Sequence, residues 1–507
     1  MRVCFVMAVP HVIPYFWRPL GKGMVRVGLF GVLVFVLCGS VRAQLVRRDV
    51  LLYPEKLHQD VDLLREVLLT CHPDPFRFTD SLSIVARFEA LKDSIRVPMS
   101  VEAFQESLVP VLRTIGDRNC QPQLPEHIRT ELYRHRAVLP MRVRILSNGM
   151  YVEEELKGFR SLPSGSRILS INGVSADSIV QRLEGLYLAD GAIRTYRTRM
   201  IEQDLPWALY RVFGPKSGHA VRYVAPDGTT GDQVLFAITG EEMERSRKPT
   251  GAPLLPWRAS WEAESATMWL TLRTLHPDSL EAAGQRPDKF LRSVLNEAHQ
   301  NKAKALVIDV RGAGGSDLQV AEQVFAHIAK EPFRSNRQVV LRTPLPVPFE
   351  AYCERAAFQS EAHSAGVRTG TQGARSLSDK DKRVRTWRPV PKAFSGKVYI
   401  VGDGMTTDAA AALVALVKRS VRGSFVGEET GTVSIGPTGG APLVFTAPNS
   451  GIRVNVPLFR FVLEGTPDGP FDHGEQPRHT IEQRPTAIAK GRDTVRGSLL
   501  ELLREIL

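Results

Sequence analysis

The chain has 507 residues and a formal net charge of +12 at pH 7, from 66 basic and 54 acidic side chains. Its apolar and charged fractions are those of an ordinary globular protein, which excludes a disordered or fibrous chain, and its length suffices for two or three domains. Residues 1–43 hold five basic and no acidic side chains, so the remainder carries only 61 basic against 54 acidic residues. Because no long Lys/Arg run with interleaved aromatics occurs either, a nucleic-acid partner is not expected.

Residues 1–43 predict a signal peptide. Arg26 precedes the apolar run "VGLFGVLVFVLC", which is too short to span a bilayer, and small residues end the segment at Ala43. We therefore expect cleavage after Ala43, no stable membrane span in the mature chain, and export to the periplasm, the cell envelope or the extracellular space. Met24 is an alternative start. A lipoprotein anchored at Cys38 is less favoured, because Leu37 is larger than the residue a lipobox requires.

Three cysteines remain after cleavage, namely Cys71, Cys120 and Cys353. Their spacing gives no CxxC and no Cys/His pairing of a zinc site. We therefore expect neither a metal nor an organic cofactor. The odd count permits one disulfide with one free thiol, or three buried thiols, and the sequence does not choose between them.

Residues 44–125 are predicted to form a helical N-terminal segment. "LHQDVDLLREVLL" places apolar residues on one helical face, and "SVEAFQESLVPVLRTIGD" predicts a later helix capped by Ser100. Residues 126–241 are predicted to form a β-rich module, with a hairpin turning at Asn148-Gly149. Within it, "PSGSRILSINGVSADSIVQRL" indicates a strand, an Asn-Gly turn, a short strand and a helix. Residues 242–257, charged and then rich in Pro and Gly, are predicted to be a linker.

Residues 258–507 alternate between strand and helix patterns, which predicts an α/β core. "TMWLTLRTL", "AKALVIDVRG", "QVVLR", "KVYIVGD" and "SFVGEE" are the expected strands, and "DKFLRSVLNEAHQ" and "DLQVAEQVFAHIAK" are expected helices. The stretch 398–420, "VYIVGDGMTTDAAAALVALVKRS", predicts a strand, a glycine turn and an alanine-rich helix. Residues 364–386 are polar and Gly-rich and are predicted to form a surface loop.

Six segments, in the same order along the chain, resemble the tail-specific or C-terminal-processing serine proteases, especially secreted bacterial members related to the tricorn core. "LVIDVRGAGGSD" resembles their Asp-Leu-Arg-x-x-x-Gly-Gly signature, "GDGMTTDAAAALVALVKRS" their nucleophile turn, and "FVGEETGT" their Gly-Glu-x-Thr-Gly element. "RTIGDRNCQPQLP" resembles their Gly-Asp-Gly-His-Thr segment, "GSRILSINGVSADSIV" a PDZ-like module, and "FDHGEQPRHTI" their closing element. The resemblance implies an α/β (α+β) fold with a ClpP/crotonase-like protease core, a PDZ-like β-rich module and a helical N-terminal segment.

The residues that the resemblance would make catalytic are substituted. The nucleophilic serine falls on Asp408, the lysine on Val433 and the histidine on Asn119. Asn119 takes no proton near neutral pH and Val433 offers no base. At the mouth of the alanine-rich helix, Asp408 is predicted to act as the N-cap. By resemblance, the N–H of Ala409 with one from Gly314 or Gly315 would form the oxyanion hole.

Other residues near this region have more ordinary interpretations. Thr407, and next to it Thr406, are the candidates for a displaced nucleophile, although packing is the favoured role. Ser316 and Ser434 are assigned to loop solvation, His473 to a structural hydrogen bond and His72 to a turn. Asp309 and Arg311 are predicted to pair beside the buried strand, and Glu428 and Glu429 to point to opposite faces. Gly312, Gly314 and Gly315 suit either a loop that needs positive φ and a close backbone approach to a bound chain, or an ordinary turn.

Two functions from different classes follow. The favoured one is an exported, catalytically impaired protein that binds unstructured peptides or protein C-terminal tails, helped by strand addition to the PDZ-like module. The alternative is an active serine-type endopeptidase or C-terminal processing peptidase with a displaced threonine nucleophile.

Overall fold

The computed structural model describes residues 51–156, 161–246, 254–342, 349–354, 367–369, 375–440 and 442–506. The predicted signal peptide, with Met24 and Cys38, lies outside these ranges. Within them, no helix combines the length and the apolar character that a bilayer span requires. Residues Val50–Leu507 form one compact unit by their contacts.

The N-terminal segment is helical, as predicted. It consists of α2 (Pro54–Cys71), α3 (Ser81–Ser94), α4 (Val101–Leu112) and the short 3-10 helix η1 (Arg118–Cys120). Ser100 caps α4 by accepting the N–H of Ala103 at 3.2 Å, which confirms the predicted start of this helix. An isolated bridge between Gln123 and Arg453 joins the end of this segment to a strand from the far end of the chain.

The β-rich module follows. Its elements are α5 (Glu126–His135), β1 (Ala137–Val138), β2 (Met141–Leu146), β3 (Gly149–Glu155), β4 (Arg167–Ile171), β5 (Val174–Ser175), α6 (Ala176–Leu183), η2 (Glu184–Leu186), α7 (Arg194–Phe213), β6 (Gly218–Val224), β7 (Thr230–Phe236), β8 (Ile238–Thr239) and α8 (Gly240–Ser246). The antiparallel sheet has the order β2-β3-β4-β6-β7 and packs against α6 and α7. The predicted strand, Asn-Gly turn, short strand and helix at 167–183 are confirmed. In the β2–β3 hairpin, Leu146 pairs with Gly149, so the loop is one residue earlier than predicted.

The linker predicted at residues 242–257 is wrong at both ends. Residues 242–246 lie within α8, where Met243 is buried against Val138 and Ile238, and Trp257 begins the first strand of the core. The charge and proline content of this segment predict irregular structure. Burial of these two apolar side chains instead extends a helix and a strand into its ends. Residues 247–253 lie outside the described ranges.

The core is built on a six-stranded sheet of order β22-β17-β16-β11-β10-β9. All neighbouring strands are parallel except β9, which is antiparallel to β10. The strands are β9 (Trp257–Glu262), β10 (Thr267–Leu272), β11 (Ala305–Asp309), β16 (Lys397–Gly402), β17 (Ser424–Gly427) and β22 (His479–Thr480). The covering helices are α9 (Pro277–Ala282), α10 (Pro287–Gln300), α11 (Leu318–Ala326), α13 (Asp408–Arg419), α14 (Pro485–Ala489) and α15 (Thr494–Ile506), with η3 (Ala263–Ser265) between β9 and β10.

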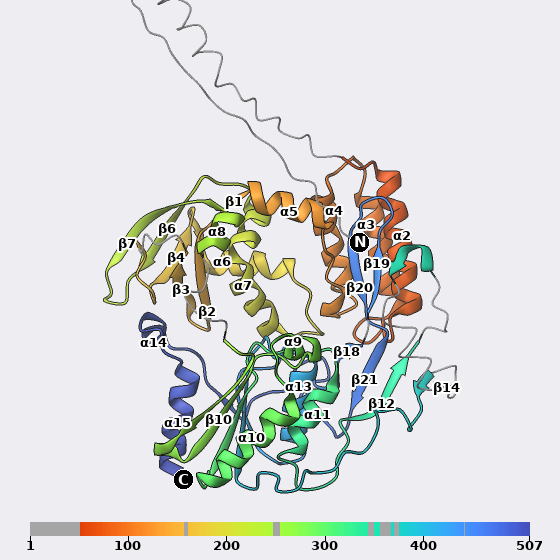
Figure 1. Cartoon of the computed structure of the whole chain (residues 1–507). Coiled ribbons are helices and arrows are strands. Elements are labelled where there is room, and N and C mark those ends of the chain that lie inside the picture. Colours follow the sequence, from red (N-terminus) through yellow and green to blue (C-terminus); the bar gives the residue numbers. More distant parts are fainter. Residues whose placement is uncertain are drawn as a thin grey trace, which may run out of the picture. The chain divides into compact units, whose positions relative to one another are not determined.

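Both faces of this sheet are buried, because successive strand residues point to opposite sides. Met268 and Leu270 share the cluster that includes α10, α11 and α13, whereas Trp269 packs with Leu499 and Leu503 of α15. Figure 1 shows α15 on the other side of the sheet from α10 and α11. The continuous apolar runs seen in the sequence therefore correspond to strands covered on both sides.

Two smaller sheets complete the core. One has the order β14-β15-β12-β21-β18 and the other β13-β19-β20. Their elements are β12 (Asn336–Leu341), η4 (Glu350–Tyr352), β13 (Cys353–Glu354), β14 (Val367–Thr369), β15 (Arg375–Leu377), β18 (Thr438–Gly439), β19 (Leu443–Thr446), β20 (Arg453–Val456) and β21 (Phe459–Leu463). The prediction of a surface loop over 364–386 is wrong where β14 and β15 pair with each other, and β15 extends β12. These polar residues form strands through backbone hydrogen bonds, although their sequence has no apolar alternation.

Candidate functional site

The candidate site lies at the turn between β16 and α13. The side chain of Asp403 holds this turn, since its Oδ1 accepts the N–H groups of Gly312 (2.9 Å) and Met405 (3.0 Å). Asp408 then begins α13 with φ +48°, in the left-handed region that Asp tolerates better than most non-glycine residues. A sharp strand-to-helix turn of this kind projects the side chain of its strained residue outward.

Asp408 forms an ion pair with Arg118 of η1 instead of capping its helix. The Nη2 atom of Arg118 contacts Oδ1 of Asp408, and both side chains are largely buried. The predicted N-cap role of Asp408 is therefore wrong: Thr407 occupies the cap position with extended backbone, and Asp408 is one residue further on. Its carboxylate still lies in the first turn of α13, where the helix dipole favours negative charge.

A second carboxylate shares the same guanidinium. Asp190 accepts the backbone N–H of Arg118 at 2.9 Å, and its Oδ2 lies 3.9 Å from the Nε of Arg118. Tyr196 lies beside them, with its ring 5.6 Å from the Cζ atom of Arg118. Burial tends to lower the pKa of Arg118, but the charges of Asp408 and Asp190 outweigh it and raise this pKa. Arg118 is therefore a fixed cation between two acids.

Burial, together with the charges in this cluster, raises the pKa of one of its two acids, Asp190. Burial raises the pKa of Asp190, the charge of Arg118 opposes that rise, and the carboxylates of Asp117 and Asp408 add to it. The result is a pKa of about 7 for Asp190. Since the reference pKa of an aspartate is 3.8, this carboxyl takes up its proton near neutral pH.

The predicted oxyanion donors lie next to Asp408 but are partly engaged. The N–H of Ala409 donates to the carbonyl of Gly315 at 3.2 Å, and the N–H of Asp408 donates to Oγ1 of Thr432 at 2.9 Å. An ideal Cβ on Gly314 would lie 2.8 Å from Oγ1 of Thr407, so glycine permits the close approach of the two loops. In this arrangement the Ala409 N–H is not available to a substrate oxyanion.

The two candidate threonines differ in their surroundings. The Oγ1 atom of Thr406 donates to the carbonyl of Val310 (3.0 Å) and accepts the N–H of Asp403 (2.9 Å), and this residue is fully buried. Its hydroxyl therefore belongs to the turn. Thr407 is 7% exposed, and its side chain makes no capping hydrogen bond. Within the described residues, no lysine or histidine is hydrogen-bonded to it.

Asn119 and Val433 do not take part in the ion pair of Asp408 and Arg118. The Nδ2 atom of Asn119 donates to Thr438, at 3.2 Å to its Oγ1 and 3.3 Å to its carbonyl oxygen. Val433 is 2% exposed and forms a β-bridge with Gly474. Neither residue supplies a proton acceptor to Asp408 or Thr407.

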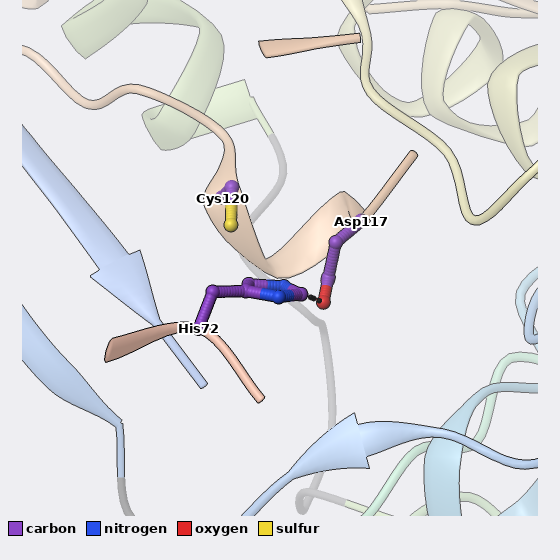
Figure 2. Close-up of side chains that lie close together, drawn as sticks. All are labelled: His72, Asp117 and Cys120. Carbon is purple, nitrogen blue, oxygen red and sulfur yellow. Dashed lines mark hydrogen bonds and ion pairs between the residues drawn. The ribbon is translucent and has the colours of Figure 1, made fainter. Parts of the chain in front are cut away.

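A buried cluster of His72, Asp117 and Cys120 anchors the loop that carries Arg118 (Figure 2). The Nδ1 atom of His72 accepts the N–H of Asp74 at 3.2 Å, so its Nε2 carries the proton that is donated to Asp117 at 2.9 Å. Thr438 also donates to Asp117. Burial alone would raise the pKa of Asp117, but the hydrogen bond and the electrostatic interaction with His72, together with the hydrogen bond from Thr438, outweigh it, and this pKa falls to about 2.

The same cluster is the group of metal-ligating side chains among the described residues, with donor atoms within 4.8 Å of one another. Such a donor set suits Zn²⁺, but a structural zinc site has four ligands, and both ring nitrogens of His72 already take part in hydrogen bonds. Burial, with the charges of Asp117 and Asp190, also keeps Cys120 a neutral thiol by raising its pKa. The cluster acts as a hydrogen-bonded support, and we assign no ion to it.

Cys71, Cys120 and Cys353 are all free and buried, so the alternative of three buried thiols is the one observed.

The remaining residues singled out in the sequence have structural partners. Arg311 pairs with Asp309 at 2.7 Å, as predicted, and also with Asp493 at 2.6 Å. Glu428 bonds Arg199 at 2.8 Å, whereas Glu429 accepts the Nδ1–H of His473 at 2.8 Å, so the two glutamates do diverge. Ser316 is exposed, and its Oγ lies 3.4 Å from Nδ1 of His276. The solvation predicted for Ser434 is wrong, because this residue is 3% exposed: its backbone N–H donates to the carbonyl of His473, and its hydroxyl has no hydrogen-bond partner among the described residues. His72 ends α2, but its buried bond to Asp117 makes it more than a turn residue.

Sequence reasoning missed Arg118, Asp190 and the segment that begins α7. An ideal Cβ on Gly404 would lie 2.5 Å from the backbone of Thr195, and Arg199 reaches Glu428, so this segment packs directly on the turn between β16 and α13. Arg118 had a signal, because it stands where the Gly-Asp-Gly-His-Thr pattern has its second glycine. A cation at 118 and an anion at 408 carry complementary charges. Asp190 carries no such pattern.

A mainly parallel α/β core with a strained strand-to-helix turn, joined to a β-rich module, is the architecture that the sequence resemblance implies. Residues 278–465 match the family model described as Peptidase family S41. Over this segment the match confirms the resemblance stated from the sequence.

Solved structures agree on the fold. A serine-to-alanine mutant of CPAF has a TM-score of 0.64 at 14% identity, covering 89% of this chain and 96% of that one. Mature CPAF complexed with lactacystin also has a TM-score of 0.64 at 14% identity, covering 89% and 98%. At this identity the likeness concerns the fold alone. Among curated proteins, none matches the sequence significantly.

Proposed function

We propose that this chain is an exported, catalytically impaired member of the S41 fold that binds unstructured peptides or protein C-terminal tails. The observation that carries the proposal is the ion pair between Asp408 and Arg118 at the nucleophile turn. A serine-type peptidase needs a hydroxyl and a proton acceptor at this place. Here a carboxylate occupies the turn and a guanidinium, which accepts no proton, faces it.

One further contact and the chemistry of a carboxylate support loss of catalysis. The N–H of Ala409 is held by Gly315, and an ionised Asp408 beside it would repel the negative oxygen of a tetrahedral intermediate. An aspartate attacking an amide would also give an anhydride, which reverts more easily than it forms. The loss therefore extends beyond one side chain to the donor set that stabilises the transition state.

Peptide binding is supported by the β-rich module, which we propose to be PDZ-like. Strand β7 ends the order of its sheet, and Val234 and Phe236 on this strand are 50% and 75% exposed. An edge strand with exposed apolar side chains can pair with an extended peptide through its free backbone groups. The tail of an exported protein is the ligand class that suits such an edge.

The test combines a reactivity assay with a binding assay on the purified chain. We expect no labelling by a fluorophosphonate probe, no casein cleavage, and saturable binding of unstructured peptides in a fluorescence-anisotropy titration. Thr407→Ala serves as the matched control. Labelling of the unaltered chain that disappears in Thr407→Ala would instead establish the alternative, an active peptidase with a displaced threonine nucleophile.

A further inference from the structure

Two segments of the core hold an excess of positive charge. Residues 330–342 and 375–392, which we call the basic ribbon, carry eleven basic and three acidic side chains, a net charge of +8. Residues 44–507 as a whole carry 61 basic against 54 acidic side chains, a net charge of +7. The rest of that range is therefore close to neutral, and its positive charge is local to the basic ribbon.

Backbone pairing holds the two segments of the basic ribbon side by side. The N–H of Phe333 donates to the carbonyl of Trp387 at 3.0 Å, and the N–H of Trp387 donates to the carbonyl of Phe333 at 2.8 Å. Further along, Leu341 of β12 pairs with Arg375 of β15, so the two segments run antiparallel. The fold therefore brings the cations of both segments together.

The exposed cations of the basic ribbon form no ion pairs, whereas two of its three acids do. Asp381 is buried and pairs with Arg383 at 2.8 Å, and Asp379 pairs with Arg368 at 2.6 Å. Nine of the eleven cations are exposed, and among the described residues none of the nine forms an ion pair. Six of these nine also make no side-chain hydrogen bond or ring contact with the described part of the chain: Lys330, Arg337, Lys380, Lys382, Arg388 and Lys392.

Aromatic side chains lie among these cations. Phe333 packs edge-to-face on Phe325, with ring centres 4.6 Å apart, and the Cζ atom of Arg385 lies 4.0 Å from the ring centre of Trp387. Phe333 and Trp387 are both partly exposed. Tryptophan is enriched where a protein meets the headgroup layer of a membrane, because its ring is amphipathic. The basic ribbon thus combines unpaired positive charge with an aromatic residue suited to that layer.

We infer that the basic ribbon docks this chain on the surface of a lipid bilayer rich in anionic phospholipids. Guanidinium and ammonium groups donate to phosphate oxygens, and clustered Lys and Arg side chains are attracted by the negative potential of such a surface. Charges carried along two strands on long flexible stems suit the many phosphates of a bilayer better than one small anion. A nucleic acid offers a similar charge, but the expected export of the chain favours lipid.

The experiment measures the binding of residues 44–507 to lipid vesicles by sedimentation. This range contains the compact unit Val50–Leu507 and lacks the predicted signal peptide, whose apolar run and basic residues would bind vesicles by themselves. One set of vesicles is phosphatidylcholine alone, and in the other about a third of the lipid is phosphatidylglycerol. Each titration is made at low salt and repeated in about 0.5 M NaCl, where charge interactions between exposed groups are largely screened.

At low salt we expect binding to the anionic vesicles to be at least about tenfold tighter than binding to the neutral ones, and we expect this preference to disappear at high salt. The ribbon variant removes three exposed cations and should reduce the preference at least about fivefold. It combines Lys330→Gln, Arg337→Gln and Arg388→Gln.

A control variant removes the same amount of positive charge elsewhere. Its three positions are exposed and form no ion pair with the described residues, and they lie on α2, on α3 and at the end of α14. The control should reduce the preference by less than about twofold, because screening confines the attraction to charges near the lipid. It combines Lys56→Gln, Arg87→Gln and Lys490→Gln.

Three outcomes would overturn the inference. The first is equal binding to both kinds of vesicle, and the second is a preference that the ribbon variant retains. The third is binding of double-stranded DNA or of an oligoglutamate peptide that the ribbon variant loses, without binding to either vesicle, because the partner would then be a soluble polyanion. The anisotropy titrations with unstructured peptides test the proposed function separately, since they contain no lipid.

Discussion

Replacing Asp408 with serine restores the residue type expected at the nucleophile turn, and we predict that it gives no peptidase. Serine removes the charge that Arg118 contacts, so a guanidinium that is 11% exposed loses its nearer partner. Breaking a fully buried ion pair costs about 3–5 kcal/mol. Since Asp408 is 22% exposed and Asp190 remains as a second partner, we expect a loss of about 1–3 kcal/mol in the free energy of unfolding.

The assay is urea unfolding at pH 7 on a double-mutant cycle of Asp408→Ser and Arg118→Gly. The double variant removes both charges and should lose less stability than the sum of the single variants. Fluorophosphonate labelling is measured on the same samples. An Asp408→Ser variant as stable as the unaltered chain would show that the pair contributes nothing, and labelling of that variant would show that a proton acceptor survives near the turn.

Three further predictions concern the same region. The folded pKa of Asp190 is about 7 and its reference pKa is 3.8, so its protonation stabilises the fold below pH 4, and this stabilisation is lost as pH rises through 7. In urea titrations between pH 4 and pH 8, the free energy of unfolding of the unaltered chain should fall by up to about 4 kcal/mol relative to that of Asp190→Asn. The pH dependence that Asp117 contributes has the opposite sign, because its folded pKa is about 2. About 2 kcal/mol of the free energy of unfolding, present above pH 4, should be lost as pH falls towards 2, and Asp117→Asn should remove that loss. Gly404→Ala would place a Cβ 2.5 Å from the backbone of Thr195 and should speed tryptic cleavage at the start of α7, whereas Gly497→Ala, which meets nothing within 4 Å, should not. Unchanged cleavage in Gly404→Ala would mean that α7 does not pack on the turn.

Local patterns were sufficient for five strands of the core, namely β10, β11, β12, β16 and β17. "ALVID" predicts a strand buried on both faces, and β11 is such a strand, because a continuous apolar run can satisfy its side chains only under two layers. Ser100 caps α4 as its sequence context requires. The pairing of β14 with β15 could not be found this way, since backbone hydrogen bonds across a sheet leave no periodic apolar signal.

By itself, the sequence predicted the resemblance to tail-specific proteases and the substituted positions 119, 408 and 433, because residue identity decides which groups can donate, accept or attack. Only the tertiary structure decided what Asp408 does instead. Capping a helix needs just the neighbouring backbone, whereas pairing with Arg118 and sharing it with Asp190 needs three segments that are 72 to 290 positions apart to meet in a buried place. The strength of an ion pair between such distant segments depends on its burial and on the distance between the charges, and the local sequence predicts neither.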